Sequence, residues 1–319
     1  MAEPIIVVGH KNPDNDSISA AVGYAYLKNE LARRDAGDGE PEAYEPVRLG
    51  PLPPESSWVL ESVGIEEPRL VENVFTKSDA PKQRVVLVDH NEVRQAVDGI
   101  EDAEVVEIID HHRIGGMTTA SPIMFLNLPL GSTASIVTLE FERNDVEMPT
   151  SIAKVLLSAI LTDTVILKSP TATATDRALV EKLSAQMGVD PTEFGLAVFK
   201  QRGGEGTMPI KEFVCADSKE FQTGEATVLI AQHETVDLAA ALEREDEARE
   251  FMRNLREQHG YQFVLLMVTD IIAEGSQFLC EGDCELVNRV FDIECIPGGV
   301  WMPGVLSRKK QVAAKILGA

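Results

Sequence analysis

Histidine and aspartate side chains follow three apolar runs of this sequence, each of which predicts a buried strand. In the clearest case, residues 105–109 are followed by Asp110, His111 and His112, and these polar groups cannot extend a buried strand without partners. Two more strands end alike, residues 5–9 delivering His10, Asp14 and Asp16, and residues 84–88 delivering Asp89 and His90. Because open α/β sheets bind ligands at the carboxyl ends of their strands, we expect these side chains to meet in one site.

A further carboxylate, Asp163, is predicted to join this site from a helix. Residues 150–164 are apolar on most faces of a predicted core helix, and Asp163 falls at its carboxyl end. An anion at that end opposes the helix dipole, and a bound cation would relieve the repulsion. A solvated terminal aspartate is the less favoured alternative.

Imidazole and carboxylate groups without thiolate form a ligand set that suits manganese, cobalt or iron and suits magnesium less well. Several carboxylates could bridge two ions about 3.5–4 Å apart, the arrangement used for in-line attack on phosphorus. Such a pair lowers the pKa of a bridging water and supplies hydroxide at neutral pH. The residue types therefore favour metal-assisted hydrolysis at phosphorus.

A basic block near the C-terminus, Arg308, Lys309 and Lys310, is conspicuous in a chain with a formal net charge of −23. Arginine binds phosphate oxygens in a bidentate manner and lysine acts as a point charge. A short charge run is usually a solvated tail, which is the alternative here. We favour an anion-binding role because the predicted metal site requires an anionic substrate.

Composition limits the class of protein. The chain has 319 residues, 44% of them hydrophobic, which is enough for two domains with sizeable cores. No apolar run approaches the ~20 residues of a membrane span, and the N-terminus carries no basic signal region, so we predict a cytoplasmic protein. The acidic balance disfavours nucleic-acid partners. It fits either a protein adapted to high salt or an ordinary acidic enzyme, and composition leaves both open.

The four cysteines, at positions 215, 280, 284 and 295, lack the Cys-x-x-Cys spacing of common zinc sites. Disulfides are not expected in the predicted compartment, so we predict reduced structural residues. Metal binding by Cys280, Cys284 and Cys295 is the less favoured alternative.

The predicted fold class is α/β, with an N-terminal doubly wound, mostly parallel sheet and a smaller C-terminal α/β domain of mixed sheet. The expected limits are residues 1–200 for the metal-binding domain, 201–206 for a Gly-rich linker and 207–319 for the substrate-binding domain. We expect a hinge at Gly203 and Gly204, and one long charged helix over residues 236–259. Strands are expected at 226–232 and 263–269, with edges near 276–281 and 299–305.

Six short segments carry a family resemblance, in order along nearly the whole chain. They are Gly9–Ser17, Val88–Glu92, Asp110–His112, Leu161–Thr164, Asp217–Phe221 and Ser307–Gln311. Together they resemble the family II, manganese-dependent inorganic pyrophosphatases of the DHH phosphoesterase superfamily. The Asp-His-His segment marks only the superfamily, whereas the last segment is the specific one. The chain is similar to the short members that have no regulatory insert.

The resemblance implies pyrophosphate hydrolysis to two orthophosphates, with a metal-bridging hydroxide as nucleophile and two manganese ions per subunit. Cobalt is a possible substitute, and magnesium could accompany the substrate. One ion would be held by His10, Asp14, Asp89 and Asp163, the other by Asp16, Asp89, His111 and Asp163. The implied substrate-binding and catalytic residues are His112, Lys219, Arg308 and Lys309, while Asp110 and His90 would orient ligands. Family members are typically homodimers through the N-terminal domain and close on pyrophosphate.

A second function remains open at this point. A sister DHH phosphodiesterase that cleaves short oligonucleotides or cyclic dinucleotides would resemble the first domain equally well. Those enzymes usually carry a Gly-Gly-Gly-His-type motif in the second domain, and this sequence has none. A metal-binding scaffold without activity is disfavoured because it leaves the basic block without a role.

Overall fold

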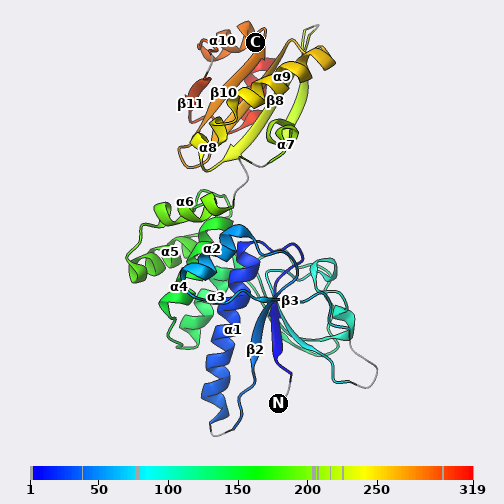
Figure 1. Cartoon of the computed structure of the whole chain (residues 1–319), viewed down its shortest axis with the longest axis vertical. Helices are drawn as coiled ribbons and strands as arrows, with labels where there is room; N and C mark the ends of the chain where they lie inside the picture. Colours follow the sequence, from blue (N-terminus) through cyan, green and yellow to red (C-terminus); the bar gives the residue numbers. More distant parts are fainter. Residues whose placement is uncertain are drawn as a thin grey trace. The chain divides into compact units, whose positions relative to one another are not determined.

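The computed structural model divides the chain into two compact units, residues 1–202 and residues 203–319 (Figure 1). It describes all residues except 1–2, 38, 76–79, 203–205, 207, 216, 225, 297 and 319. The hinge predicted at Gly203 and Gly204 lies outside the described residues.

The first unit is built on a six-stranded sheet with the order β3-β2-β1-β4-β5-β6, in which every pair of neighbouring strands is parallel. The strands are β1 (Ile5–Val8), β2 (Tyr44–Arg48), β3 (Arg69–Leu70), β4 (Arg84–Val88), β5 (Glu104–Asp110) and β6 (Met124–Asn127). The strand order reverses between β1 and β4. In open α/β sheets a ligand crevice forms at such a switch point, outside the carboxyl ends of the strands.

Helices cover one face of this sheet, and turns and loops cover the other. The helices are α1 (Asn15–Ala36), α2 (Pro54–Ser62), α3 (Thr133–Arg143), α4 (Thr150–Asp163), α5 (Ala174–Met187) and α6 (Pro191–Gln201). Helix α1 packs against both α3 and α4, and α4 is buried over most of its length (Figure 1). The opposite face carries the 3₁₀ turns η1 (Val93–Gln95) and η2 (Ile100–Asp102). Val97, which lies between these turns, and Ile100 of η2 join the core with Leu87 and Ile108.

The second unit has a five-stranded mixed sheet with the order β11-β10-β9-β8-β7. The strands are β7 (Asp217–Thr223), β8 (Ala226–Thr235), β9 (Phe263–Asp270), β10 (Gly275–Gly282) and β11 (Val300–Pro303). Only β8 and β9 pair in parallel; the other neighbours are antiparallel. The predicted α/β class, with a parallel N-terminal sheet and a mixed C-terminal sheet, is confirmed.

Two apolar layers cover the two faces of the mixed sheet. One face packs against α7 (Ile210–Cys215), α8 (Leu238–Leu242) and α9 (Glu245–His259), and the other against α10 (Glu285–Phe291), η3 (Arg308–Ala313) and α11 (Ala314–Leu317). Strand β9 is buried on both faces because its side chains alternate: Leu266 points to the α9 layer and Leu265 to the α10 layer.

The single charged helix predicted over 236–259 is wrong, because the structure breaks it into α8 and α9. Asp237 caps the short helix α8 by accepting a hydrogen bond from the amide of Ala240 at 3.1 Å. Helix α9 restarts at Glu245 with three acids in its first turn, where they complement the helix dipole. Each of the two helices thus has its own start signal, and these signals divide a segment whose charge pattern is continuous.

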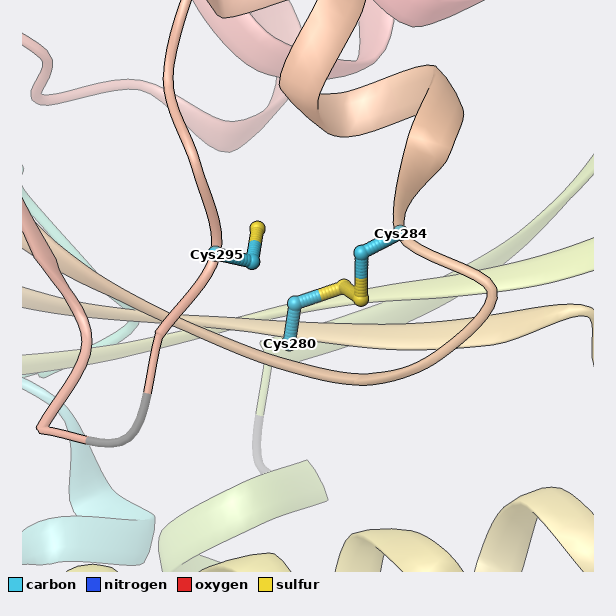
Figure 2. A group of neighbouring side chains, drawn as sticks. All are labelled: Cys280, Cys284 and Cys295. Atoms are coloured by element: carbon cyan, nitrogen blue, oxygen red, sulfur yellow. A yellow bond between two sulfur atoms is a disulfide. The ribbon is translucent and has the colours of Figure 1, made fainter.

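The prediction of four reduced cysteines is also wrong, because Cys280 and Cys284 form a disulfide (Figure 2). The two residues flank the turn that ends β10 and precedes α10, and their Cα atoms lie 6.4 Å apart, within the usual range for a disulfide. Cys215 and Cys295 are free. The sequence spacing of four residues did not predict the disulfide, because a tight turn is needed to bring the two cysteines together.

No helix in the described ranges is both long and apolar enough to cross a membrane.

Candidate metal centre

The loop after β1 presents His10 and starts helix α1. Its backbone passes so close to α1 that a Cβ at Gly9 would come within 1.8 Å of the Ser17 hydroxyl oxygen, so only glycine fits. The Ser17 hydroxyl accepts a hydrogen bond from the His10 amide at 2.9 Å, and Asp14 caps the helix by accepting from the Ser17 amide at 2.9 Å. These contacts fix the positions of His10 and Asp14 relative to one another.

Backbone carbonyls orient the two histidines that face the carboxylates. The Nδ1 atom of His10 lies 2.8 Å from the carbonyl oxygen of Lys11, and Nδ1 of His111 lies 3.0 Å from that of Leu130. A carbonyl oxygen accepts, so each Nδ1 carries a proton and Nε2 is the nitrogen that can bind a metal once it gives up its own proton. Both rings therefore offer Nε2 as a metal ligand.

Asp89 stands at the centre of the site. It follows β4 with a left-handed backbone (φ 63°) and its side chain is buried. One carboxyl oxygen lies 3.4 Å from Nε2 of His10 and the other lies 3.5 Å from Nε2 of His111. Thr133 donates its hydroxyl to Asp89 at 3.0 Å. A single carboxylate thus faces two separate histidines.

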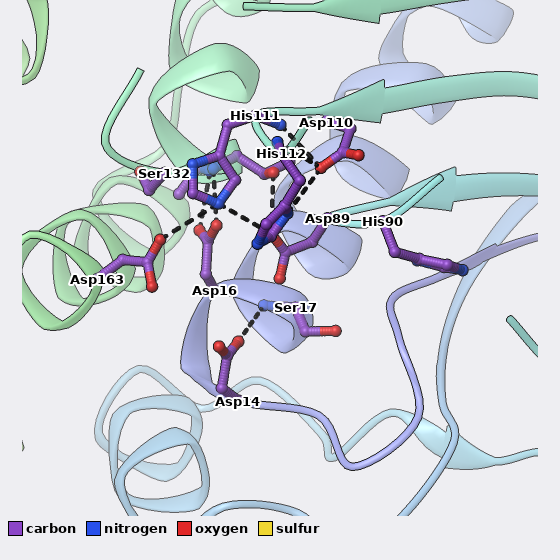
Figure 3. A network of polar contacts seen from close by, with 12 residues as sticks. Asp14, Asp16, Ser17, Asp89, His90, Asp110, His111, His112, Ser132 and Asp163 are labelled. Carbon is purple, nitrogen blue, oxygen red and sulfur yellow. Dashed lines mark hydrogen bonds and ion pairs between the residues drawn. The ribbon is translucent and has the colours of Figure 1, made fainter. Parts of the chain in front are cut away.

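Ligand atoms gather in three overlapping groups, each with its atoms within 4.8 Å of one another. Figure 3 labels every member of these groups except His10. The groups are His10, Asp14 and Asp89; Asp16, His111 and Asp163; and Asp89, His111 and His112. In the second group, a carboxyl oxygen of Asp163 lies 3.4 Å from Nε2 of His111. The structure therefore brings together all six side chains predicted as metal ligands, from the segments that follow β1, β4 and β5 and from α1 and α4.

Asp16 is held by the N-terminus of helix α3. Its carboxyl oxygens accept from the amides of Thr133 at 2.6 Å and Ala134 at 2.9 Å. Unpaired amides at a helix start favour a negative charge. Sequence reasoning missed this contact because backbone amides have no signature in residue types.

Asn15 is a second feature that the sequence did not reveal. Its buried side chain donates to the hydroxyls of Ser158 (3.1 Å) and Thr162 (3.2 Å) on α4. Ser56 of α2 donates to the Asn15 side-chain oxygen at 2.9 Å. Asn15 thereby locks the start of α1, which carries Asp16, to the end of α4, which carries Asp163.

The Asp110 carboxylate positions His112. It lies 3.0 Å from Nδ1 of His112 and also accepts from the amides of His111 (2.8 Å) and His112 (3.1 Å) and from the Asn91 side chain. Asp110 is buried, whereas the His112 side chain is 53% exposed. The buried carboxylate of Asp110 thus holds the His112 ring, and the ring itself is exposed to solvent.

His90 lies apart from these groups. Its Nδ1 atom is 2.9 Å from the carbonyl oxygen of Val88, and its buried Nε2 atom has no hydrogen-bond partner among the described residues. The ring points away from Asp89 (Figure 3).

The protein alone leaves excess negative charge at this site. Burial and the neighbouring Asp89 raise the pKa of Asp16 and raise that of Asp163 to about 7. Burial would lower the pKa of His10, but hydrogen bonds to Asp14 and Asp89 raise it to about 11; the pKa of His111, similarly opposed by burial, rises to about 10. A divalent cation would remove this repulsion. Oxygen and imidazole donors without sulfur fit manganese.

Three of the four predicted substrate-binding residues, Lys219, Arg308 and Lys309, lie in the second unit. Arg308, at the start of η3, pairs with Asp217 in a bidentate manner, at 2.6 and 3.1 Å, and its amide donates to the Gln232 side chain at 3.0 Å. Lys219 lies two residues beyond Asp217 on β7, so both point to the same face of that strand. Lys309 follows Arg308 in η3 and is exposed. Gln232 is a further residue that sequence analysis missed, because nothing in its strand marks it.

The fold and the site define a metal-dependent hydrolase of the DHH class. Residues 4–160 match the DHH family, N-terminal domain, and residues 197–319 match the DHHA2 domain. A relative from Archaeoglobus fulgidus named "Probable manganese-dependent inorganic pyrophosphatase" is 41% identical over 98% of this chain and 97% of its own. The "Manganese-dependent inorganic pyrophosphatase" of Methanothrix thermoacetophila is 38% identical over the same shares.

A solved structure from Methanococcus jannaschii, of a candidate family II inorganic pyrophosphatase, is also similar. It is 33% identical, with a TM-score of 0.58 over 98% of both chains. The chain belongs to the family of manganese-dependent inorganic pyrophosphatases.

Proposed function

We propose that this protein hydrolyses inorganic pyrophosphate to two orthophosphates and uses manganese as its cofactor. The observation that carries the proposal is Asp89, whose two carboxyl oxygens face His10 and His111 at 3.4 and 3.5 Å. A carboxylate between two imidazoles suits two adjacent metal positions. The names of the full-length relatives support the substrate and the metal.

The residues would divide between two ions. His10, Asp14, Asp89 and Asp163 would hold one, and Asp16, Asp89, His111 and Asp163 the other. When bound, the ions would activate water and neutralise phosphate charge; cobalt could replace manganese, and magnesium could accompany the substrate. Asp163 approaches His111 directly, which supports its place in the second set.

His112 would contact the substrate or the leaving phosphate. Its exposed ring and its hydrogen bond to the buried Asp110 support this role. The hydrogen bond to that carboxylate raises the pKa of His112, which favours a protonated ring that can donate to a phosphate oxygen.

Lys219, Arg308 and Lys309 would bind the phosphate groups. Asp217 occupies two of the five N–H donors of the Arg308 guanidinium, which leaves others for phosphate oxygens. The ion pair also restricts the side chain, so less conformational freedom is lost when an anion binds.

We further propose a cytoplasmic homodimer, joined through the first unit, that does not bind nucleic acid. The net charge of −23 supports the last point, since it repels a polyanion.

The test compares phosphate release from pyrophosphate with mononucleotide release from a dinucleotide, each with manganese, cobalt or magnesium. We expect pyrophosphate to be turned over far faster, with manganese or cobalt the best activator, and chelation to abolish activity until metal is restored. Comparable or faster cleavage of the dinucleotide would instead establish the DHH phosphodiesterase.

A further inference from the structure

Three cysteine sulfur atoms gather in the second unit, and none of these cysteines has a part in the proposed reaction (Figure 2). Cys280 lies near the end of β10, Cys284 immediately precedes α10, and Cys295 lies between α10 and β11. Their sulfur atoms are all within 4.8 Å of one another. Cys280 is buried and the other two are partly buried, in the apolar layer that also contains Val312 of η3.

The backbone around the cluster places the sulfurs together independently of the disulfide. Gly282 turns the chain with φ 107°, and a Cβ there would meet the carbonyl oxygen of Gln262 at 2.5 Å. The Gln262 side chain then donates to Asp283 at 2.9 Å. Asn288 accepts from the Cys295 amide at 2.9 Å, which fixes the third cysteine against α10.

Arg249 of α9 ties the same two segments from another direction. Its guanidinium donates to the carbonyl oxygens of Cys280 and Ile296, each at 3.3 Å. Ion pairs with Glu245 (2.6 Å) and Glu281 (2.9 Å) hold the guanidinium there. Reduction of the disulfide would therefore leave three thiols facing one another rather than dispersing them.

We propose that the reduced cluster is a second metal site, in which Cys280, Cys284 and Cys295 bind one thiophilic divalent ion of the zinc class. Three sulfur ligands select such ions over manganese and magnesium, and zinc can complete its coordination with water. A phosphine reductant supplies two electrons to open the Cys280–Cys284 bond and leaves as the phosphine oxide, while water supplies the oxide's oxygen and the two thiol protons. Metal binding then releases the three thiol protons.

Cys215 provides a matched control within the same unit. It is also a free, partly buried cysteine, but it lies at the end of α7 and packs in the opposite apolar layer. A Cys215→Ser variant removes one thiol without touching the cluster, whereas Cys295→Ser removes one ligand and leaves the disulfide pair intact.

The test uses Co²⁺ as a spectroscopic probe for zinc. The full chain is reduced with a phosphine under argon, saturated with Mn²⁺ to fill the histidine–carboxylate site, and titrated with Co²⁺. We expect a thiolate-to-cobalt charge-transfer band that saturates at one equivalent and bleaches on addition of Zn²⁺. The band should be lost in Cys295→Ser, retained in Cys215→Ser and absent from the oxidised protein.

Alkylation mapped by mass spectrometry gives a second measurement. Bound Zn²⁺ should protect Cys280, Cys284 and Cys295 together and leave the labelling rate of Cys215 unchanged. No charge-transfer band in the reduced protein, an undiminished band in Cys295→Ser, or protection of Cys280 and Cys284 alone would overturn the proposal. Pyrophosphate hydrolysis is not part of the readout, so this result and that of the proposed function are independent.

Discussion

The metal centre of the first unit and the basic block of the second are assembled in different ways. In the first unit, side chains from five elements converge, and buried contacts fix nearly every one, as with Asp16 on the α3 amides. In the second, Arg308 and Lys309 share one turn and Lys219 lies on an edge strand, with Asp217 as the main anchor. A rigid ligand set suits a cation that demands fixed geometry, whereas partly exposed bases suit a substrate that must enter and leave.

The largest effect is expected from the shared carboxylate. Asp89→Asn replaces a charge that faces both histidines with a neutral amide, so both metal positions should weaken. We expect hydrolysis of pyrophosphate to fall by at least about 10³-fold, in line with several kcal/mol of lost charge stabilisation. The Asp163→Asn substitution should also reduce the rate of pyrophosphate hydrolysis. Steady-state phosphate release at saturating manganese measures both, and near-normal turnover of either variant would remove that residue from the ligand set.

Next in size is the loss of the anion-binding arginine. Arg308→Ala should reduce hydrolysis by about 2–4 kcal/mol of transition-state stabilisation while manganese affinity without substrate stays unchanged. The control is Arg253→Ala, which removes a half-exposed arginine of the same unit that pairs with Glu281. Loss of manganese binding in proportion to activity would show that the basic block is structural.

A smaller loss of turnover is expected from a substitution of Asp110, which positions the exposed ring of His112. Asp110→Asn keeps the size of the side chain but weakens its hold on His112, so turnover should drop by about 10–100-fold. His112→Gln gives the reference value for complete loss of the imidazole. If Asp110→Asn is more damaging than His112→Gln, Asp110 supports more of the site than His112 alone, and manganese titration of the two variants locates the difference.

The smallest effect concerns the acidic surface rather than either site. With a net charge of −23, the melting temperature should rise from dilute buffer to molar potassium chloride, because salt screens self-repulsion. Thermal unfolding followed by circular dichroism measures the melting temperature. The control replaces the salt with sucrose, an uncharged solute, at equal osmolality. A flat or falling melting temperature would favour an ordinary acidic enzyme and would not affect the catalytic proposal.

The two regions also differ in what the sequence reveals. The strands that deliver His10, Asp89 and Asp110 were predictable, because a buried apolar run that ends in charge is a strong local signal. The contacts of Asp16 with α3 amides and of Arg308 with Gln232 were not, because they join distant segments through groups that any sequence contains. Strand β6 was missed for a related reason: its four residues lie at a sheet edge, and Met124 and Phe125 are 40% exposed.

The disulfide is a second contact that could not be predicted from the residue types alone. The predicted cytoplasmic compartment favoured free thiols, but the turn at Gly282 brings Cys280 and Cys284 together. The residue type indicates that a cysteine can be a free thiol, a metal ligand or half of a disulfide. Which cysteines form the disulfide depends on the path of the backbone.

The count of manganese ions bound per chain tests the central claim most directly. Equilibrium titration, with free manganese followed by electron paramagnetic resonance, should give two ions for the natural chain. His10→Gln and His111→Gln, which each remove one imidazole from a different set, should each retain one ion. A natural chain that binds a single ion, or a single histidine replacement that abolishes all binding, would contradict two ligand sets joined by Asp89.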